Sequence, residues 1–167
     1  FKFTLNLGVS DYERRKTYTT QPFYGYYAGQ GGYVYIYHYR TTTFNFQQLL
    51  NYSKTFGDHS ISALIGHENY KYNYAYVWGG KTNMYSYFGN QELGGAITLN
   101  STDSETKDYN TEGYFLRAQY DYKEKYFLSG SYRRDASSRF HPDNRWGNFW
   151  SVGGAWILTK EDWFKQD

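Results

Sequence analysis

The chain is organised by runs of residues in which apolar and polar side chains alternate. From residue 114 to residue 122 the even positions are apolar or aromatic, whereas the odd positions include Arg117 and Gln119. A period of two is that of a β-strand with one apolar and one polar face. The alternation restarts at Tyr126 after the short polar segment 123–125, which predicts an antiparallel hairpin.

Further alternating runs bring the number of predicted strands to six. They cover residues 1–10, residues from about 35 to 56, and a less strongly polarised run at residues 150–158. The run at residues 60–78 is irregular, because its aliphatic side chains occupy odd positions and its tyrosines occupy even ones. One inserted residue reverses the faces of a strand, so we expect a β-bulge near Gly66.

The connections between these strands alternate between long and short. Long connections cover residues 13–34, 79–109 and 135–147, short ones cover residues 57–59 and 123–125, and a turn is expected at residues 159–162. Transmembrane β-barrels show this alternation when long loops face outward and short turns face the periplasm. The predicted fold class is therefore all-β: an antiparallel transmembrane β-barrel segment of about six strands with long extracellular loops and short periplasmic turns.

In such a barrel the apolar face of each strand meets lipid. Aromatic residues then lie at both membrane interfaces. We expect Tyr52, Tyr122 and Tyr126 near the periplasmic interface and Phe44, Tyr114, Tyr132 and Trp150 toward the outer one.

The composition is compatible with this fold. Aromatic residues make up 23% of the 167 residues, yet the mean hydropathy is −0.86. No run of 18 apolar residues exists, which excludes a transmembrane helix, whereas alternating barrel strands average to a low hydropathy. The formal net charge of +2 favours no particular charged partner, and the absence of cysteine excludes a disulfide framework.

Motifs for catalysis, metal binding or phosphate binding are missing. His67-Glu68 lacks the second histidine of a helical zinc site, and no serine lies in a G-x-S-x-G motif. The four histidines are scattered over different segments, and the glycines at residues 29–32 are not followed by a predicted helix. The sequence therefore predicts no enzyme, no cofactor and no metal site.

Candidate substrate-binding residues come from the loops and from the polar strand face. Flat aromatic rings stack on sugars and peptides at low entropic cost, although such rings also pack loops together. The loop candidates are Tyr24, Tyr26, Tyr27, Tyr85, Tyr87 and Phe88. Arg117 and Gln119, on the polar face, are expected to be hydrogen-bonding groups of a lumen wall and weaker candidates for substrate contact.

A long motif near the C-terminal end resembles a known family. It comprises Ser131-Tyr-Arg-Arg-Asp-Ala-Ser-Ser-Arg-Phe140, Asn144-Arg-Trp-Gly147 and Ser151-Val-Gly-Gly-Ala-Trp156. This stretch is similar to the SusC/RagA family of TonB-dependent outer-membrane transporters, in which Gly usually stands at the position of Ala136. The resemblance extends over roughly residues 42–164.

The resemblance implies energised uptake of glycans or peptides across the outer membrane of a Gram-negative, Bacteroidetes-type cell. It implies a SusD-like surface lipoprotein as a lid, a TonB complex reached through parts of the parent chain, and contact with outer-membrane lipid. Nothing in it points to nucleic acid.

Residues 1–167 are then expected to be part of a single β-barrel domain whose plug and remaining strands lie elsewhere. Phe1 begins inside an alternating pattern, and residues 163–167 lack the terminal aromatic residue with which such barrels usually finish. Two alternatives stay open. One is a small self-contained outer-membrane barrel, such as a porin or adhesin, and the other is a soluble carbohydrate-binding β-sandwich.

Overall fold

A computed structural model describes residues 1–164 as an antiparallel β-sheet. Residues 165–167, the end of the segment in which we noted the missing terminal aromatic residue, lie outside the described residues. The strands are β1 (Lys2–Thr20), β2 (Tyr33–Phe56), β3 (His59–Met84), β4 (Ala96–Tyr122), β5 (Tyr126–Ser137) and β6 (Trp146–Trp156). Short 3₁₀ helices are formed by Ala28–Gln30, Leu93–Gly95, Pro142–Asn144, Leu158–Lys160 and Asp162–Phe164. Within residues 1–164 no helix is long and apolar enough to cross a membrane.

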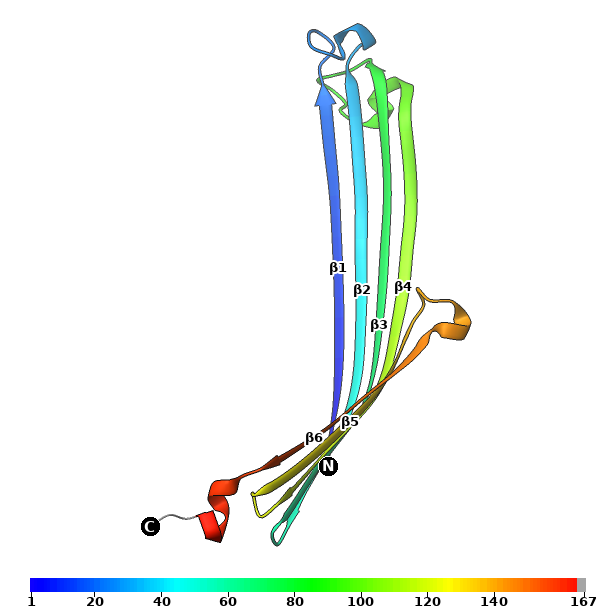
Figure 1. Ribbon diagram of the computed structural model, residues 1–167. Helices are drawn as coiled ribbons and strands as arrows, with labels where there is room; N and C mark the ends of the chain where they lie inside the picture. The colour runs from blue at the N-terminus through cyan, green and yellow to red at the C-terminus, as the bar shows by residue number, and fades with distance from the viewer. Residues whose placement is uncertain (165–167) are drawn as a thin grey trace. The chain divides into compact units, whose positions relative to one another are not determined.

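The six strands form one sheet in the order in which they occur along the chain (Figure 1). Strands β1 and β6 are its two edges, so the sheet formed by the described residues is open. One open, antiparallel, six-stranded sheet confirms the predicted barrel segment. It also excludes a two-layer sandwich made by residues 1–164.

The register of the last three strands confirms the predicted hairpin and the weaker strand after it. Leu116 of β4 lies opposite Tyr132 of β5, and Tyr132 lies opposite Trp150 of β6. Gln119 likewise lies opposite Ser129. The apolar positions of the three strands therefore share one side of the sheet, which we call the apolar face, and the polar positions share the other, the polar face.

Side-chain contacts assign the faces of the first three strands. The rings of Phe1 and Tyr52 are 4.7 Å apart, whereas the amides of Asn6 and Gln47 are hydrogen-bonded at 2.9 Å. The odd positions of β1 thus share a face with the even positions of β2, as the alternation of apolar residues predicts. The hydroxyls of Thr55 and Ser60 bond at 2.9 Å and join the even positions of β3 to the polar face.

The expected bulge near Gly66 is wrong. Ser62 contacts Gln119, and Gly66 and Glu68 face Phe115 and Arg133, so the even positions of β3 stay on the polar face through this region. The apolar residues of β3 move from odd to even positions because the types of residue on its two faces change, while the backbone continues without an inserted residue. The aliphatic residues of β3 lie on the apolar face, and its tyrosines continue the positions of the polar face.

Strands β1 to β4 are longer than predicted. Residues 13–20 and 96–109, which we expected in loops, lie in β1 and β4, and residues 79–84 extend β3. Apart from Ile97 and Leu99, these segments are mainly polar on both sides and so give no sustained apolar alternation. Cross-strand hydrogen bonds, such as Tyr76 to Asp103 at 3.1 Å, join them instead. The connection between β5 and β6 is correspondingly shorter than predicted.

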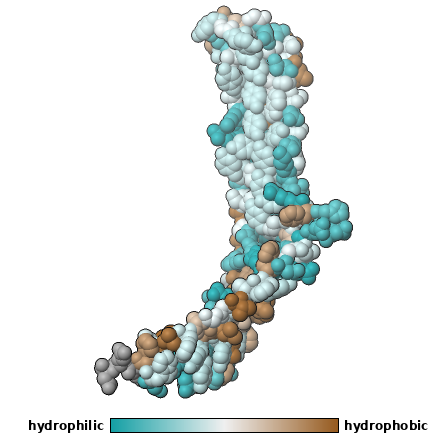
Figure 2. All heavy atoms as spheres, viewed as in Figure 1, coloured by the Kyte–Doolittle hydropathy of each residue, from teal (hydrophilic) through white to brown (hydrophobic). Residues whose placement is uncertain are grey.

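The chain divides into two compact units. Unit 1 comprises Phe1–Gly8, Phe44–Lys71 and Tyr109–Asp167, and unit 2 comprises Val9–Thr43 and Tyr72–Asp108. In Figure 2 hydrophobic residues gather on unit 1, whereas the strands of unit 2 show mainly pale and hydrophilic residues. The buried cluster of unit 2 consists of Val34, Ile36, Met84 and Ala96, with Tyr87 and Leu93 packed against it.

Candidate ligand-binding face

One face of unit 2 is covered by aromatic rings, and we call it the tyrosine face. Its members are Tyr12 on β1, Tyr33, Tyr35, Tyr37 and Tyr39 on β2, and Tyr74, Tyr76 and Trp78 on β3. Alternate residues of a strand point to the same side, so the spacing of two places the rings of each strand in a row. Tyr74, Tyr76 and Trp78 occupy even positions of β3, as do Ser62 and Glu68, which lie on the polar face.

The rings of neighbouring strands are in mutual contact. Ring centroids are 5.6 Å apart for Tyr35 and Trp78, 5.8 Å for Tyr37 and Tyr76, and 6.1 Å for Tyr39 and Tyr74. Aromatic pairs interact favourably at 4.5–7 Å. Packing between neighbours therefore holds each ring in place, while the side chains stay only partly buried.

The hydroxyl groups of this face are also linked. The hydroxyls of Tyr37 and Tyr74 are 2.8 Å apart, and the Tyr76 hydroxyl donates to a carboxylate oxygen of Asp103 at 3.1 Å. The hydrogen bond with Tyr37 raises the pKa of Tyr74 to about 12. The phenol consequently stays neutral at physiological pH and can act as a donor or an acceptor.

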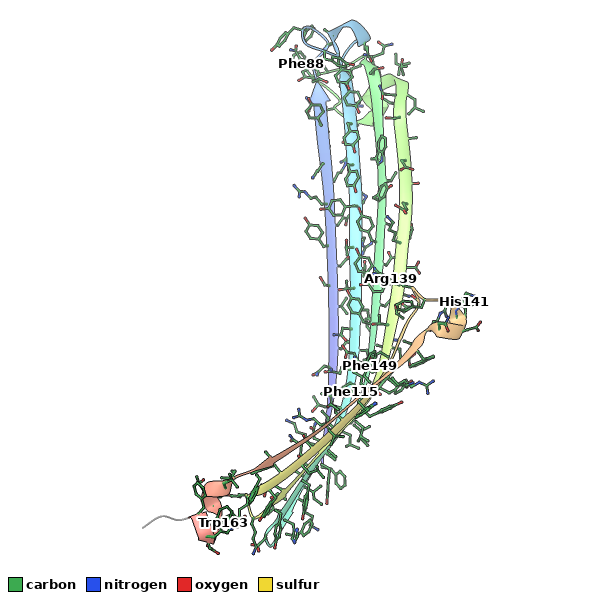
Figure 3. All side chains as sticks on the ribbon, viewed as in Figure 1. Phe88, Phe115, Arg139, His141, Phe149 and Trp163 are labelled. Carbon is green, nitrogen blue, oxygen red and sulfur yellow. The ribbon has the colours of Figure 1, made fainter. Side chains whose placement is uncertain are left out.

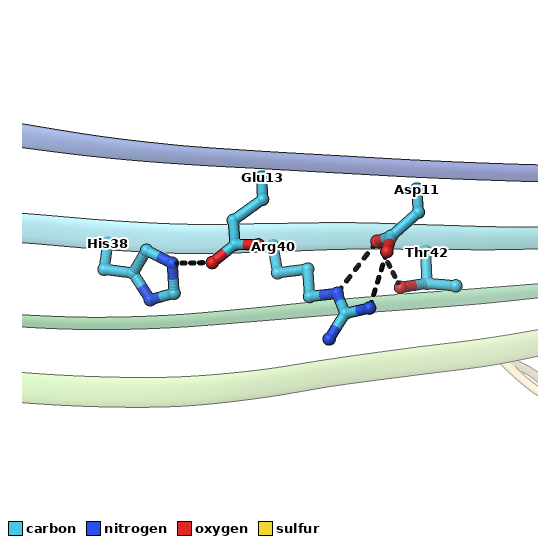
Figure 4. A network of polar contacts seen from close by, with 5 residues as sticks. All are labelled: Asp11, Glu13, His38, Arg40 and Thr42. Atoms are coloured by element: carbon cyan, nitrogen blue, oxygen red, sulfur yellow. Dashed lines mark hydrogen bonds and ion pairs between the residues drawn. The ribbon is translucent and has the colours of Figure 1, made fainter.

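The opposite face of β1 and β2 in unit 2 carries an ion-pair network (Figure 4). Arg40 donates to Asp11 through Nε at 2.8 Å and through Nη2 at 2.5 Å, and Thr42 donates to Asp11 at 3.1 Å. His38 lies 2.5 Å from the carboxylate of Glu13. Hydrogen bonding by Arg40 lowers the pKa of the Asp11 carboxyl. Each of the two basic side chains in this network therefore has an acidic partner.

Two basic residues of β1 lie on the tyrosine face instead. Arg14 and Lys16 have the parity of Tyr12, whose ring is 5.8 Å from that of Tyr39. Within residues 1–164 neither has a carboxylate partner at ion-pair distance, whereas Arg15 between them pairs with Glu92. A hydrogen bond with Tyr12 chiefly lowers the pKa of Tyr39, and the positive charges of Arg14 and Lys16 lower it further.

The predicted loop aromatics all belong to unit 2, and the structure brings part of them together. The ring of Phe23 lies 6.5 Å from that of Tyr87 and 6.2 Å from that of Phe88, so the two long loops meet. Phe88 lies among these loops in Figure 3. Tyr27 stacks on Tyr33 at 4.5 Å and thereby extends the tyrosine face.

The other predicted loop aromatics differ in exposure. Tyr24, Tyr26, Tyr85 and Phe88 are largely exposed and remain candidates for ligand contact. The Tyr85 hydroxyl donates to the carbonyl oxygen of Gly94 at 2.7 Å. Tyr87 packs against the buried cluster, so its first role is to hold the loop.

Arg117 and Gln119 lie in unit 1, apart in the chain from the loop aromatics. Both occupy the polar face of β4, as predicted, and Gln119 accepts a hydrogen bond from Ser62 at 3.4 Å. Gln119 also lines a hollow of about 640 Å³ together with Asp121, Phe127 and Ser129. Polar side chains of several strands could make hydrogen bonds there with a neighbouring surface.

The motif after Ser131 fastens the β5–β6 loop to β4. The Ser138 N–H donates to the carbonyl oxygen of Asn110, and the Asn110 N–H donates to the Ser138 hydroxyl, both at 2.9 Å. The guanidinium of Arg139 lies 3.8 Å from the centre of the Tyr109 ring. Ala136 lies in the ladder opposite Trp146, where the strand does not require glycine.

Arg133 anchors the base of this motif on the polar face. It donates to Asp135 at 2.8 Å, lies 3.4 Å from Glu68, and covers the ring of Phe115 at 5.2 Å from the centroid. A second hollow, of about 490 Å³, includes Arg133 and Asp135 together with Phe149. Figure 3 shows Phe115 and Phe149 in this part of the sheet and Arg139 at the loop. The motif thus has a structural role that its sequence alone did not reveal.

No group of three potential metal ligands occurs among residues 1–164. His38 and His67 each bind a carboxylate, of Glu13 and Glu112 respectively. These histidines therefore serve ion pairs and hydrogen bonds within the sheet.

The tyrosine face was missed in the sequence because its residues were divided between a predicted loop, the predicted strand from about residue 35 to 56 and a strand with an assumed bulge. The signal was present in β3, where Tyr70 and Tyr74 keep the parity of Ser62 without interruption. In β1, Arg14 and Lys16 lay in the predicted loop and had no assigned face.

Comparison with known proteins shows clear relatives. The chain is 31% identical to TonB-dependent receptor P39 of Formosa agariphila over 131 residues and 35% identical to its TonB-dependent receptor P3 over 143 residues. These matches cover 74% and 83% of the chain and 12% and 14% of the two receptors. The chain thus spans about an eighth of the length of these relatives. It matches no protein-family model.

A shorter match and a solved structure agree with these relatives. TonB-dependent receptor SusC of Bacteroides thetaiotaomicron is 40% identical over 52 residues, which are 31% of the chain and 5% of that receptor. The structure of the RagAB peptide transporter superposes with a TM-score of 0.86 at 21% identity and covers 99% of the chain and 19% of that structure's chain. With the motif at residues 131–156, these likenesses show that the chain belongs to the SusC/RagA family of TonB-dependent receptors.

Proposed function

We propose that the chain is part of the barrel wall of an outer-membrane transporter that imports glycans or peptides with energy delivered through TonB. Family membership supports this proposal. The observation that carries it is a change of polarity on the apolar face, at which each strand passes from apolar to polar side chains.

Every strand shows this change, beyond which the face is mainly polar, with apolar exceptions such as Ile36 on β2, Val77 on β3 and Trp146 on β6. The last apolar and first polar residues on this face are Val9 and Asp11 on β1, Phe44 and Thr42 on β2, Ile65 and His67 on β3, Tyr114 and Glu112 on β4, Tyr132 and Arg134 on β5, and Trp150 and Asn148 on β6. Toward the short turns the face is apolar or aromatic, with Gln48, Lys54 and His59 as polar exceptions.

The apolar part of this face is exposed in the sheet. Leu7 is 61% exposed, Leu128 57% and Val152 71%. A contiguous apolar surface of this kind requires a cover. Lipid fits it, because Phe44 to Tyr52 spans about 20 Å at a rise of roughly 3.3 Å per residue and a tilt of about 40°, close to the apolar band of outer-membrane barrels.

Lipid on this side places the polar face toward the barrel interior. The polar segments of β1 to β4, which carry the long loops, would then lie outside the membrane, and the tyrosine face would line the substrate path. The short turns, residues 57–58 and 123–125, face the periplasm. The hollow beside Gln119 faces the interior, where the plug of the parent chain would lie.

The proposed partners are those that family membership implies, and this orientation assigns each of them a side of the membrane. A SusD-like surface lipoprotein would sit over the long loops, and TonB would act through parts of the parent chain outside residues 1–167. The small self-contained barrel gains no support from the structure, because β1 and β6 are unpaired edges in the described residues.

Deletion of the gene for the parent receptor tests this proposal. The mutant should lose growth on one class of oligosaccharide or peptide and should regain it with the intact gene, and loss of TonB should have the same effect. The receptor should fractionate with the outer membrane. Undiminished growth on both classes of substrate, or a receptor found in a soluble fraction, would contradict the proposal.

A further inference from the structure

We propose that the tyrosine face binds oligosaccharides that carry an acidic group, with sugar rings stacked on the tyrosines and the acidic group held by Arg14 and Lys16. The inference rests on the proposed function as an importer and names the class of substrate that this part of the barrel wall binds. The carboxylate of a uronic acid and the sulfate ester of a sulfated sugar both carry the negative charge that Arg14 and Lys16 would bind.

The rings form a continuous aromatic surface, in which the ring planes of Tyr35 and Trp78 are inclined by 39° and those of Tyr39 and Tyr74 by 48°. Tyr37 and Tyr76 are inclined by only 20° to each other, and both lie on central strands of the sheet, where neighbouring rings restrict their movement. Tyrosine offers a large amphipathic surface at a low cost in conformational entropy. The C–H face of a pyranose matches such a ring in size and polarity, and the hydroxyl of Tyr74 remains protonated for hydrogen bonding.

The basic residues of β1 give the tyrosine face a positive side. Arg14 and Lys16 lack acidic partners within the described residues, and their charges act on the hydroxyl of Tyr39. By contrast, Arg15 and Arg40 on the opposite face are paired with Glu92 and Asp11. Arg14, which is hydrogen-bonded to Tyr39, and Lys16 thus keep positive charges on the tyrosine face that no carboxylate neutralises, and these charges are available to an anion.

The β4 side of the tyrosine face carries acidic side chains. On β4, Asp103 accepts the hydrogen bond of Tyr76, and Glu105 pairs with Lys107 at 2.9 Å. The two strands are three strand spacings apart, or about 14 Å. An acidic group is therefore attracted to the β1 side, and the carboxylates of the β4 side can accept hydrogen bonds from sugar hydroxyls.

The same features favour a saccharide over a peptide. A peptide that adds to a sheet needs an unpaired strand edge and pockets for alternate side chains. The tyrosine face lies instead on the paired central strands β2 and β3 and presents rings side by side. Cyclic units of a glycan can repeat along these rings.

The test uses the bacterium that carries the full-length receptor. Its gene is replaced by variants Arg14→Gln/Lys16→Gln, Tyr76→Leu, and two controls on the opposite face of the same strands, Arg15→Gln and Val77→Ala. Uptake is measured with partial hydrolysates of pectin, alginate and a sulfated galactan, with neutral oligosaccharides from starch and mannan, and with a tryptic digest of casein. Immunoblots of outer membranes show that each receptor is present in equal amount.

Loss of charge-assisted hydrogen bonds predicts that the double variant takes up an acidic hydrolysate at least about tenfold more slowly than the wild type. Tyr76→Leu should reduce the same uptake, and the controls should not. The pectin, alginate and galactan arms separate carboxylate from sulfate.

Three results would overturn the inference. They are loss of peptide uptake in the variants, loss restricted to neutral oligosaccharides, and normal uptake in the variants of a substrate that the gene deletion abolishes. If deletion of the gene leaves all uptake unchanged, the proposed function fails and this inference fails with it.

Discussion

Gly66 lies directly beneath the ring of Phe115 on the polar face. A Cβ atom at this position would be 2.2 Å from Cζ of the ring, and Arg133 covers the ring from the other side at 5.2 Å. The ring therefore has no space to move away from the sheet without breaking the contacts of Arg133 with Asp135 and Glu68. Residue 66 must therefore be glycine, which has no Cβ atom, to fit beside this ring.

Gly66→Ala should therefore destabilise the full-length receptor by about 1–3 kcal/mol, the usual cost of overpacking. Gly130→Ala is the matched control, because a Cβ there would be 4.0 Å from its nearest neighbour. Thermal unfolding followed by heat modifiability on gels would measure both. Equal stability of the two variants would show that the ring of Phe115 can move aside and accommodate a Cβ atom at residue 66.

The Asp11–Arg40 pair predicts a pH dependence. Hydrogen bonding by Arg40 lowers the pKa of Asp11 in the folded state. A lowered carboxyl pKa stabilises the fold at pH values above the unfolded value of about 3.9, and the contribution disappears as the pH falls through the folded value. The melting temperatures of the wild type and Asp11→Asn should therefore differ near pH 7, and the difference should shrink as the pH falls below about 3.9 toward the lowered folded value. A constant difference would show that Asp11 acts without ionising.

At the scale of single strands, β4 changes its environment along its length. Leu116 lies on the apolar face opposite Tyr132, three residues from Gln119 on the polar face. Nearer its N-terminal end, the strand carries Asp103 and Glu105. A single strand thus contributes an apolar-faced segment to unit 1 and a polar segment to unit 2.

Leu116→Arg should destabilise the receptor by roughly 2–4 kcal/mol, because it places a charge on the lipid face near the middle of the membrane. Gln119→Arg, with the same charge on the interior face, should cost much less. Chemical denaturation of the receptor in detergent or lipid would compare them. Equal losses would mean that the faces are assigned incorrectly.

The sequence predicted those parts of the strands in which one side is apolar. Alternation from Tyr114 to Tyr132 determined the hairpin, since a slip of one residue would turn Leu116 away from lipid. Alternation did not reveal residues 13–20 or 96–109, because these segments are mainly polar on both sides, with only Ile97 and Leu99 in alternation, and their pairing depends on partners distant in sequence. The tyrosine face was hidden for the same reason, since β1, β2 and β3 contribute separately to it.

At the scale of the whole molecule, the described residues form an open sheet. Strands β1 and β6 expose unpaired backbone groups, and each such group costs several kcal/mol in hydrocarbon. An isolated sheet of this kind is therefore not viable in a bilayer, and we expect its edges to pair with other strands of the proposed barrel.

Residues 1–167 expressed alone with lipid vesicles should accordingly give neither a heat-modifiable band nor ion conductance. The full-length receptor, refolded in the same way, is the control and should give a heat-modifiable band. A stable, heat-modifiable monomer of residues 1–167 would show that this sheet closes by itself.

The assignment of the two faces is the central claim, and spin labels test it most directly. Cysteines placed one at a time at Leu128, Ser129, Ser151 and Val152 of the full-length receptor in lipid would carry the label. Leu128 and Val152 lie on the apolar face, and Ser129 and Ser151 lie on the polar face. We expect labels at the first two positions to be accessible to oxygen dissolved in lipid, and labels at the other two to be accessible to a water-soluble nickel complex. The assignment of the faces would be contradicted if the nickel complex reached Leu128 and Val152 while oxygen reached Ser129 and Ser151, or if all four labels were equally accessible to both reagents.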